Sequence, residues 1–286
     1  MHGYRKGTVE SADGTVIGYR EIGEGPAVIL LHGGMLAAQH MMTLAEILAD
    51  TFTVCVPDRR GRGLSGPHGE RFGVERETED VAALAATTGA ARIFGLSSGA
   101  LVALRAALHL PGLTRVALYE PPLSSGGSTP LGWTNRYERE IAAGKRGAAM
   151  ITALKGLRVE PSLARIPRSV LGVLIPLALR AQGGAGVDDV AVDDLIPTLH
   201  YDIQIVRETA ETAAEYAKVD APVLLMGGSK SPDYLRTALD ALETTLPHAE
   251  RVTLARMGHD GPTDDGSPAR VGAILRDFFG PSASRG

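Results

Sequence analysis

The sequence predicts an α/β fold in which helices flank a mostly parallel, eight-stranded sheet. Two observations predict it. Short apolar runs alternate with segments of helical period, both before residue 122 and after residue 218. The run at 26–31 is apolar throughout, which is typical of a strand buried on both faces. Such alternation builds a parallel sheet that is covered by helices.

The strands and helices follow one another in a regular order. The turn residues Asp13 and Gly14 precede the run at 15–22, so the first two strands should form a hairpin. Further strands are expected at 26–31, 52–57, 92–96, 115–119, 222–226 and 251–254. Helices are expected at 39–50, 75–88, 98–110, 232–246 and 268–279.

Residues 122–218 interrupt this alternation, because they contain helical patterns and loops but no convincing strand. We therefore expect one core, made of residues 1–121 and 219–280, that carries residues 122–218 as a helical cap. Residues 281–286 should form a loose tail.

The most apolar helical segment of the chain lies in this cap, at 169–181. It is shorter than the roughly 18 residues that a membrane crossing requires. We therefore expect no membrane span, and we expect this segment to form a helix that packs over a pocket. The alternative is an interfacial helix that dips into lipid, because Arg165, Arg168 and Arg180 flank the segment.

Composition excludes several classes of function. Hydrophobic residues make up 44% and charged residues 22% of the 286 residues, which suffices for a packed core. The net charge of −4 provides no basic surface for nucleic acid. Cys55, the single cysteine, can form neither an internal disulfide nor a metal site, which favours a cytoplasmic location.

Residues 95–99 read Gly-Leu-Ser-Ser-Gly and lie between a predicted strand and a predicted helix. A nucleophile at Ser97 would occupy a sharp, strained turn, and the small Gly95 and Gly99 leave room for it. The free N–H groups at the start of the helix would face a developing oxyanion. The glycine spacing centres the turn on Ser97; the alternative is an ordinary turn in which Ser98 caps the helix.

Four further features occur in the order that the α/β-hydrolase fold family shows, so that nearly the whole chain resembles this family. Residues 32–35 (HGGM) resemble its oxyanion loop, and residues 58–65 (DRRGRGLS) resemble its D-x-R-G-x-G-x-S turn. Residues 122–218 occupy the position of its cap, and residues 258–259 (GH) resemble the loop of its catalytic histidine. The resemblance implies the family's fold and a hydrolase.

A serine nucleophile needs a base within hydrogen-bonding reach. Of the eight histidines, only His259 follows the last predicted strand and precedes the final helix, and the resemblance also puts the catalytic histidine last. The resemblance further implies that the backbone N–H groups of Gly34 and Ser98 hold the oxyanion. His32 lies in the resembling oxyanion loop and is expected to be structural.

Two carboxylates compete for the role of orienting His259. In the commonest family pattern the acid follows the strand after the cap, but Ser231 stands there, and Asp233 lies two residues later at a helix start. We call the turn at 95–99 the elbow and the helix expected at 98–110 the elbow helix. Glu120 ends the strand after the elbow helix, where one type of haloalkane dehalogenase and the zearalenone-type lactonases carry their acid. The carboxyl ends of parallel strands meet in one crevice, and Pro121 should hold Glu120 extended. We prefer Glu120 and keep Asp233 as the alternative.

The turn at 61–66 spells G-x-G-x-x-G, the dinucleotide fingerprint, but it continues as a loop instead of opening a helix. We therefore expect no nucleotide and no other cofactor or metal. Arg59, Arg60 and Arg62 in the same turn should be solvated or paired with nearby acids such as Glu70.

These features predict a serine hydrolase that cleaves a carboxylic ester or lactone through an acyl-enzyme. The cap residues Trp133, Tyr137, Met150 and Tyr201 favour a largely apolar small-molecule substrate. The alternatives are a thioesterase or carbon–carbon bond hydrolase with the same triad, and a lyase or ligand-binding protein on the same fold. The sequence does not decide the oligomeric state, and a homodimer and a monomer are both compatible with it.

Overall fold

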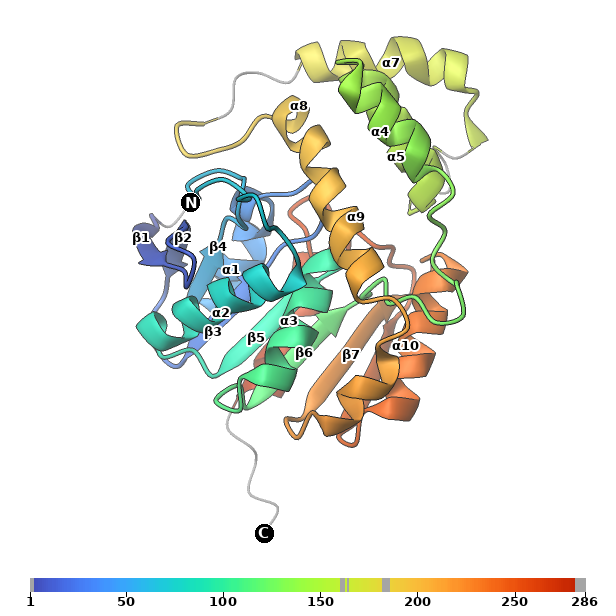
Figure 1. Cartoon of the computed structure of the whole chain (residues 1–286). Coiled ribbons are helices and arrows are strands. Elements are labelled where there is room, and N and C mark those ends of the chain that lie inside the picture. Colours follow the sequence, from blue (N-terminus) through green and yellow to red (C-terminus); the bar gives the residue numbers. More distant parts are fainter. Residues whose placement is uncertain (1–2, 160–162, 164, 182–185, 281–286) are drawn as a thin grey trace.

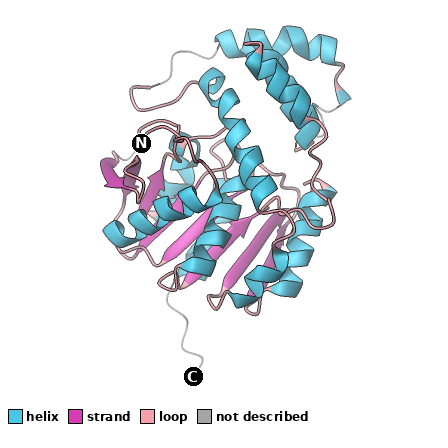
Figure 2. Cartoon of the chain, viewed as in Figure 1, coloured by secondary structure: helices cyan, strands magenta, loops and turns pink. Residues whose placement is uncertain are grey.

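An eight-stranded sheet with helices on both faces forms the centre of the computed structural model, which describes residues 3–159, 163, 165–181 and 186–280 (Figures 1 and 2). The strand order is β1-β2-β4-β3-β5-β6-β7-β8. The strands are β1 (Arg5–Glu10), β2 (Val16–Ile22), β3 (Ala27–Leu31), β4 (Thr53–Pro57), β5 (Arg92–Leu96), β6 (Arg115–Tyr119), β7 (Val223–Gly228) and β8 (Ala249–Leu254).

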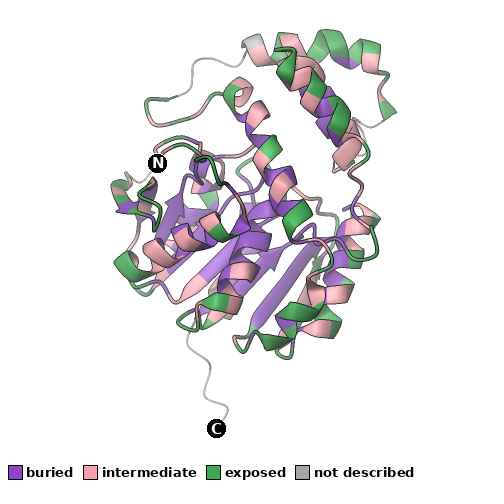
Figure 3. Ribbon diagram, in the orientation of Figure 1, coloured by how far each residue is buried: buried purple, intermediate pink, exposed green. Residues whose placement is uncertain are grey.

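The sheet is mostly parallel, as the sequence predicts. β1 and β2 form the expected antiparallel hairpin, and β2 also pairs antiparallel with β4. All pairs from β4 to β8 are parallel. The interior strands are buried along almost their whole length, which explains their uninterrupted apolar sequences (Figure 3).

Two groups of helices cover the two faces. α1 (Met42–Leu48) and α11 (Pro268–Phe279) pack together on one face, and a short 3-10 helix, η1 (Ala38–Met41), precedes α1. α2 (Val74–Thr88), α3 (Ser98–His109) and α10 (Asp233–Thr245) cover the other face. Each group buries its apolar side chains against the sheet, so the core consists of two apolar layers.

Helices and loops fill the described part of the segment between β6 and β7, and none of its described residues forms a strand. Its helices are α4 (Thr134–Ala142), α5 (Arg146–Leu157), α7 (Arg168–Ala181), α8 (Val192–Leu195), η2 (Ile196–Thr198), α9 (Leu199–Glu208) and η3 (Ala213–Lys218). Figure 1 shows α9 between the sheet and the outer helices α4, α5 and α7. α9 and η3 both pack against α3, so both join this segment to the helix that follows Ser97.

α7 forms the outer surface of the segment (Figures 1 and 3). It packs against α5 and buries Leu171, whereas Val173 and Leu177 are 69% and 61% exposed. Pro176 and Leu179 of α7 line a surface cavity together with residues at the start of α5, so the helix packs over a pocket there, but none of the described residues of α7 lines the cavity that Ser97 lines. Among the described residues, no helix has the length and apolarity to cross a membrane. The tail expected at 281–286 lies outside the described residues.

Candidate functional site

Four neighbouring strands bring the predicted site residues to one edge of the sheet. Ser97 follows β5, Glu120 follows β6, Gly228 ends β7, and His259 lies in the loop after β8. Because β5, β6, β7 and β8 are adjacent and parallel, their carboxyl ends meet at the same edge. Residues far apart in sequence thus come together there.

The turn at Ser97 is strained. Its backbone has a φ of 55° and a ψ of −122°, in the region that non-glycine residues rarely adopt. A Cβ atom at Gly99 would lie 2.4 Å from the carbonyl oxygen of His32, and one at Gly95 would lie 2.4 Å from that of Gly99. The turn therefore requires both glycines. Ser98 begins α3, so its N–H group has no acceptor within the helix.

His259 contacts Glu120 directly. Its Nδ1 atom lies 2.6 Å from Oε2 of Glu120, and the other carboxylate oxygen accepts the N–H group of Gly228 at 2.6 Å. The Glu120 side chain is 1% exposed. Because the carboxylate accepts a hydrogen bond from the Nδ1–H group, it favours the neutral tautomer that leaves Nε2 as an acceptor. The Tyr119 hydroxyl supports the histidine loop by donating to the carbonyl of Gly258 at 2.7 Å.

The backbone of Glu120 differs from the expectation. Its φ is 49°, in the left-handed region, so the prediction that Pro121 holds it extended was wrong. The N–H group of Glu120 still continues the ladder by donating to the carbonyl of Met226 at 3.0 Å. The chain then turns away from the sheet, and the carboxylate contacts with His259 and Gly228 offset the strain of this conformation.

The other candidate acid lies elsewhere. Asp233 is the first residue of α10, its side chain is 90% exposed, and it forms an ion pair with Arg236. Ser231, at the position where the commonest pattern has its acid, is buried. The structure thus brings Glu120, and not Asp233, to His259.

The loop after β3 packs closely against the elbow. A Cβ atom at Gly33 would lie 3.1 Å from Cβ of Ser97. Among the described residues, nothing accepts a hydrogen bond from the N–H group of Gly34. His32 is fully buried; burial and the nearby Arg62 and Arg59 hold its pKa well below the usual value. Its neutral ring links the loops structurally.

The hydrogen bonds of His32 show how it does so. Its Nδ1 atom lies 2.9 Å from the carbonyl of Gly33, and its Nε2 atom accepts the N–H group of Arg59 at 3.1 Å. A neutral imidazole with its proton on Nδ1 satisfies both contacts. His32 therefore fixes the loop after β3 to the loop after β4.

A small cavity of about 80 Å³ lies beside the predicted site residues. Ser97, Ser98, His259 and Gly34 line one side of it. Mostly apolar residues line the rest: Pro122, Thr129, Pro130, Leu131, Trp133, Leu157, Val159, Leu199, Asp202, Ile203, Val206 and Tyr234. A second cavity of about 450 Å³ lies next to it and has a more polar lining, which includes Lys230, Arg256 and Asp260; Val159 lines both cavities.

The cap residues expected at the substrate have different positions. Trp133 lines the small cavity. Tyr137 is buried and donates its hydroxyl to the carbonyl of Ile196 at 2.6 Å, and Met150 packs in the same apolar cluster. Tyr201 stacks on the ring of His68. Only the first of the four therefore contributes to this cavity.

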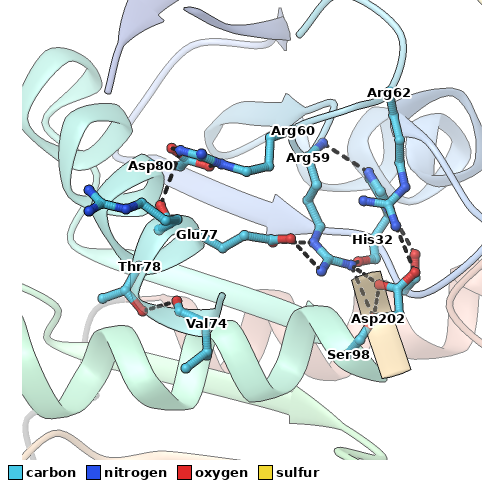
Figure 4. Close-up of polar contacts among 12 residues, drawn as sticks. His32, Arg59, Arg60, Arg62, Val74, Glu77, Thr78, Asp80, Ser98 and Asp202 are labelled. Atoms are coloured by element: carbon cyan, nitrogen blue, oxygen red, sulfur yellow. Dashed lines mark hydrogen bonds and ion pairs between the residues drawn. The ribbon is translucent and has the colours of Figure 1, made fainter. Parts of the chain in front are cut away.

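Arg59 lies in a buried network beside the cavity (Figure 4). Its guanidinium forms two hydrogen bonds to Glu77, of 2.5 and 2.9 Å. Its Nη1 atom also donates to Oγ of Ser98 at 3.0 Å and to Oδ1 of Asp202 at 2.9 Å. Burial lowers the pKa of Arg59, but Glu77 and Asp202 raise it more, so the guanidinium stays charged.

The other two arginines of the turn are also buried and paired. Arg60 pairs with Asp80 and Asp13, and Arg62 pairs with Asp202 at 2.6 Å. The expectation that acidic residues pair with these arginines is thus confirmed, but the arginines are buried instead of solvated, and among the described residues no ion pair involves Glu70. The turn folds inward, and its partners come from the nearby helix α2, from the turn of the β1–β2 hairpin, and from α9, whose Asp202 is 140 positions from Arg62.

Sequence reasoning missed Asp202, although α9 carries a signal for it. Leu199, Asp202, Ile203 and Val206 follow the spacing of one helical face, and all four line the cavity. An acidic residue on an otherwise apolar helical face is the feature that identifies this position. Among the described residues, no cluster of histidine, cysteine or acidic side chains could hold a metal ion.

Comparisons with known proteins support the fold. The model of the alpha/beta hydrolase family matches residues 28–274. The crystal structure of an alpha/beta hydrolase from Sphaerobacter thermophilus superposes with a TM-score of 0.76 at 32% sequence identity, covering 96% of this chain and 100% of that one. A thermophilic esterase from Thermogutta terrifontis shares the fold at 19% identity, with a TM-score of 0.71 and coverage of 96% and 98% of the two chains.

Two curated proteins are also similar. N-formylmaleamate deformylase from Pseudomonas putida is 36% identical over 137 residues, which are 45% of this chain and 51% of the deformylase. This chain thus aligns with only about half the length of that relative. Pimeloyl-[acyl-carrier protein] methyl ester esterase from Xanthomonas campestris is 26% identical over 251 residues, 83% of this chain and 89% of the esterase.

Proposed function

The chain belongs to the alpha/beta hydrolase family, and within this family we propose that it is a serine hydrolase that cleaves a carboxylic ester or lactone of a small, largely apolar molecule. One observation carries the proposal: His259 contacts the buried carboxylate of Glu120 and lines the same cavity as the strained Ser97. A base that a carboxylate orients and that reaches Oγ of Ser97 would activate the serine hydroxyl. Among the described residues no hydrogen bond joins Ser97 to His259, so the proposal requires Nε2 to meet Oγ when substrate binds.

In the proposed mechanism, Oγ of Ser97 attacks the carbonyl carbon while Nε2 of His259 takes its proton. The carbonyl π electrons move to the oxygen, and the N–H groups of Gly34 and Ser98 stabilise this oxyanion. When it collapses, the bond to the leaving oxygen breaks and His259 protonates that oxygen, which departs as the alcohol. Water then attacks the acyl-enzyme while His259 takes its proton. Collapse of the second oxyanion breaks the bond between Oγ of Ser97 and the acyl carbon, His259 returns the proton to Oγ, and the acid product leaves.

Glu120 has the role of orienting acid in this mechanism. Its contact with Nδ1 of His259 favours the productive tautomer, and its negative charge stabilises the imidazolium that forms during the reaction. Asp233 is excluded from this proposal because its carboxylate is exposed and pairs with Arg236.

The cavity supports a short acyl group. Its volume of about 80 Å³ is far below the roughly 300 Å³ or more of pockets that hold drug-sized ligands. Its apolar lining suits an alkyl chain, and we propose residues 122–218 as the cap that supplies most of it. The larger, more polar cavity next to His259 would hold the leaving alcohol.

Hydrolysis of a short N-acyl amide is the second candidate. The small cavity fits a formyl or acetyl group as well as a short ester, and one partial relative is named as a deformylase. The oxyanion chemistry is the same for both substrates. They differ in the leaving group, because an amine must be protonated by His259 before the bond breaks.

A burst assay with p-nitrophenyl acetate tests the serine mechanism. Wild type should release one equivalent of p-nitrophenolate quickly and then turn over steadily, and a fluorophosphonate should label it. Ser97→Ala should show neither burst nor labelling, whereas Ser125→Ala, in the exposed loop at the start of the cap, should match wild type. An unlabelled, inactive wild type would contradict the proposal and favour a ligand-binding protein.

A panel of substrates then distinguishes the two candidates. It contains methyl esters, lactones and N-acyl amides whose acyl groups grow from formyl to hexanoyl. The volume of the cavity predicts that kcat/KM is highest for the shortest acyl groups. Preference for the amides over the matching esters would favour the second candidate.

A further inference from the structure

Asp202 connects the cap helix α9 to the elbow of the core. Its side chain is 3% exposed and accepts hydrogen bonds from three core groups. Nη1 of Arg59 lies at 2.9 Å, Nη2 of Arg62 at 2.6 Å, and Oγ of Ser98 at 2.8 Å (Figure 4). A carboxylate from the cap thus lies beside the residue that follows the proposed nucleophile.

The same carboxylate also contacts the loop after β3. A Cβ atom at Gly34 would lie 3.1 Å from both Cγ and Oδ2 of Asp202. Because a Cβ atom at Gly33 would lie 3.1 Å from Cβ of Ser97, this loop is packed between the proposed nucleophile and Asp202. Asp202 therefore contacts Ser98 and lies close to Gly34, the two residues whose N–H groups are proposed to hold the oxyanion.

The charges around Asp202 depend on one another. Glu77 makes two hydrogen bonds to Arg59, so Asp202 is the carboxylate that neutralises the fully buried Arg62. Among the described residues, Nη1 of Arg62 has no hydrogen-bond partner even with Asp202 present. Burial raises the pKa of Asp202, but Arg62 and Arg59 outweigh this and hold it below the usual value. Asp202 is therefore ionised.

We propose that Asp202 is a positioning residue that couples the docking of α9 to the geometry of the oxyanion hole. The proposal rests on the proposed serine mechanism. With Asp202 in place, the N–H groups of Gly34 and Ser98 are held by the cap as well as by the core. Without it, the buried Arg62 loses its counter-charge and shifts, and the loop at Gly34 loses the surface on which it packs.

Asp202→Asn tests this coupling because it removes the charge and keeps the size of the side chain. Loss of one oxyanion donor lowers kcat by about 100- to 1000-fold. Asp202→Asn displaces the N–H groups of Gly34 and Ser98 without removing them, so it should lower kcat by roughly 10- to 1000-fold. KM for p-nitrophenyl acetate should change by less than about 3-fold, because the apolar lining remains.

Glu208→Gln is the matched control. Glu208 lies on the same helix and also joins it to the core, by accepting the N–H group of Val74 at 2.7 Å, but it does not line the cavity. If Asp202 only attaches α9, both substitutions should lower kcat equally. If it acts through the oxyanion hole, Glu208→Gln should stay within about 3-fold of wild type.

A transition-state analogue provides a readout that a purely structural role would not change. Ser97 adds to a short-chain trifluoromethyl ketone, and the resulting hemiketal oxyanion occupies the oxyanion hole. The inhibition constant of this ketone should rise for Asp202→Asn by about the same factor as kcat falls, while that of the matching methyl ketone stays within about 3-fold. Equal increases for both ketones would overturn the proposal.

Thermal unfolding identifies variants that do not fold. If Asp202→Asn is unfolded, Ser98→Ala replaces it, because this change removes the hydroxyl contact with Asp202 and leaves the backbone N–H group in place. Ser98→Ala should then lower kcat by about 3- to 30-fold, and an unchanged kcat overturns the proposal. An inactive wild type overturns the serine mechanism and this inference with it. If wild type is active but Asp202→Asn and Glu208→Gln have the same kcat, only this inference is overturned.

Discussion

Glu120 and His259 are joined by a contact of 2.6 Å between Oε2 and Nδ1, although 139 positions separate them in the chain. The other oxygen of the carboxylate is also fixed, because it accepts the N–H group of Gly228. A carboxylate held at both oxygens can orient an imidazole without moving itself. This relationship makes Glu120 the residue whose replacement is most informative about the mechanism.

Glu120→Gln should lower kcat by about 100- to 10,000-fold, because an amide cannot stabilise the imidazolium or enforce the same tautomer. KM should change little, since Glu120 does not line the cavity. Steady-state kinetics with p-nitrophenyl acetate measure both quantities. Asp233→Asn is the control and should stay within about 2-fold of wild type. A large fall in kcat for Asp233→Asn alone would reverse the assignment of the acid.

Gly99→Ala should destabilise the protein, because the new methyl group would lie 2.4 Å from the carbonyl oxygen of His32. Overpacking of this kind costs about 1–3 kcal/mol of unfolding free energy, and a backbone contact cannot relax easily. Urea denaturation followed by circular dichroism measures the loss. Gly112→Ala provides the comparison, since a Cβ atom there meets nothing within 4 Å. Equal stability of the two variants would show that the elbow is not close-packed.

The buried His68 should make stability depend on pH. Burial and the nearby Arg62 lower its pKa from 6.5 to about 3 in the folded protein. Between these values the unfolded chain binds a proton that the folded protein does not, so the free energy of unfolding falls as the pH falls. The contribution of His68 reaches about 1.4 kcal/mol per pH unit.

His68→Phe removes this contribution and keeps an aromatic ring against Tyr201. Urea denaturation of wild type and variant at pH 4, 5, 6 and 7 measures it. Wild type should lose stability relative to the variant as the pH falls from 6 to 4. Parallel profiles for the two proteins would mean that His68 titrates alike in the folded and unfolded states.

Local sequence patterns predicted the parts of this molecule that depend on neighbouring residues. The apolar runs of β5 and β6 end where the turn residues begin, and the structure has both strands at the expected bounds. The glycine spacing around Ser97 reflects steric contacts within one turn, which a short motif can record. The fold could be predicted because each of its signals is local.

Features that depend on distant contacts could not be predicted in this way. Asp202 meets Arg62 across 140 positions, and no local pattern records that pairing. The positive φ of Glu120 follows from contacts with β7 and with the loop after β8, whereas the sequence around it shows only the proline that follows. The exposed face of α7 depends on which helix lies beneath it. These are properties of the packed chain.

Cys55 should not react with thiol reagents in the folded protein. It is fully buried in β4, and burial together with the carboxylate of Glu21 raises the pKa of its thiol to about 12. Thiol reagents need the thiolate, which is almost absent at pH 8 under these conditions. Ellman's reagent should therefore label one thiol per chain in 6 M guanidinium and almost none in buffer. Cys55 lies in β4, between β2 and β3, so labelling in buffer requires the sheet to open at β4. A ligand that stabilises the fold should therefore lower the rate of labelling. Fast labelling that such a ligand does not change would show that the thiol is accessible in the folded state.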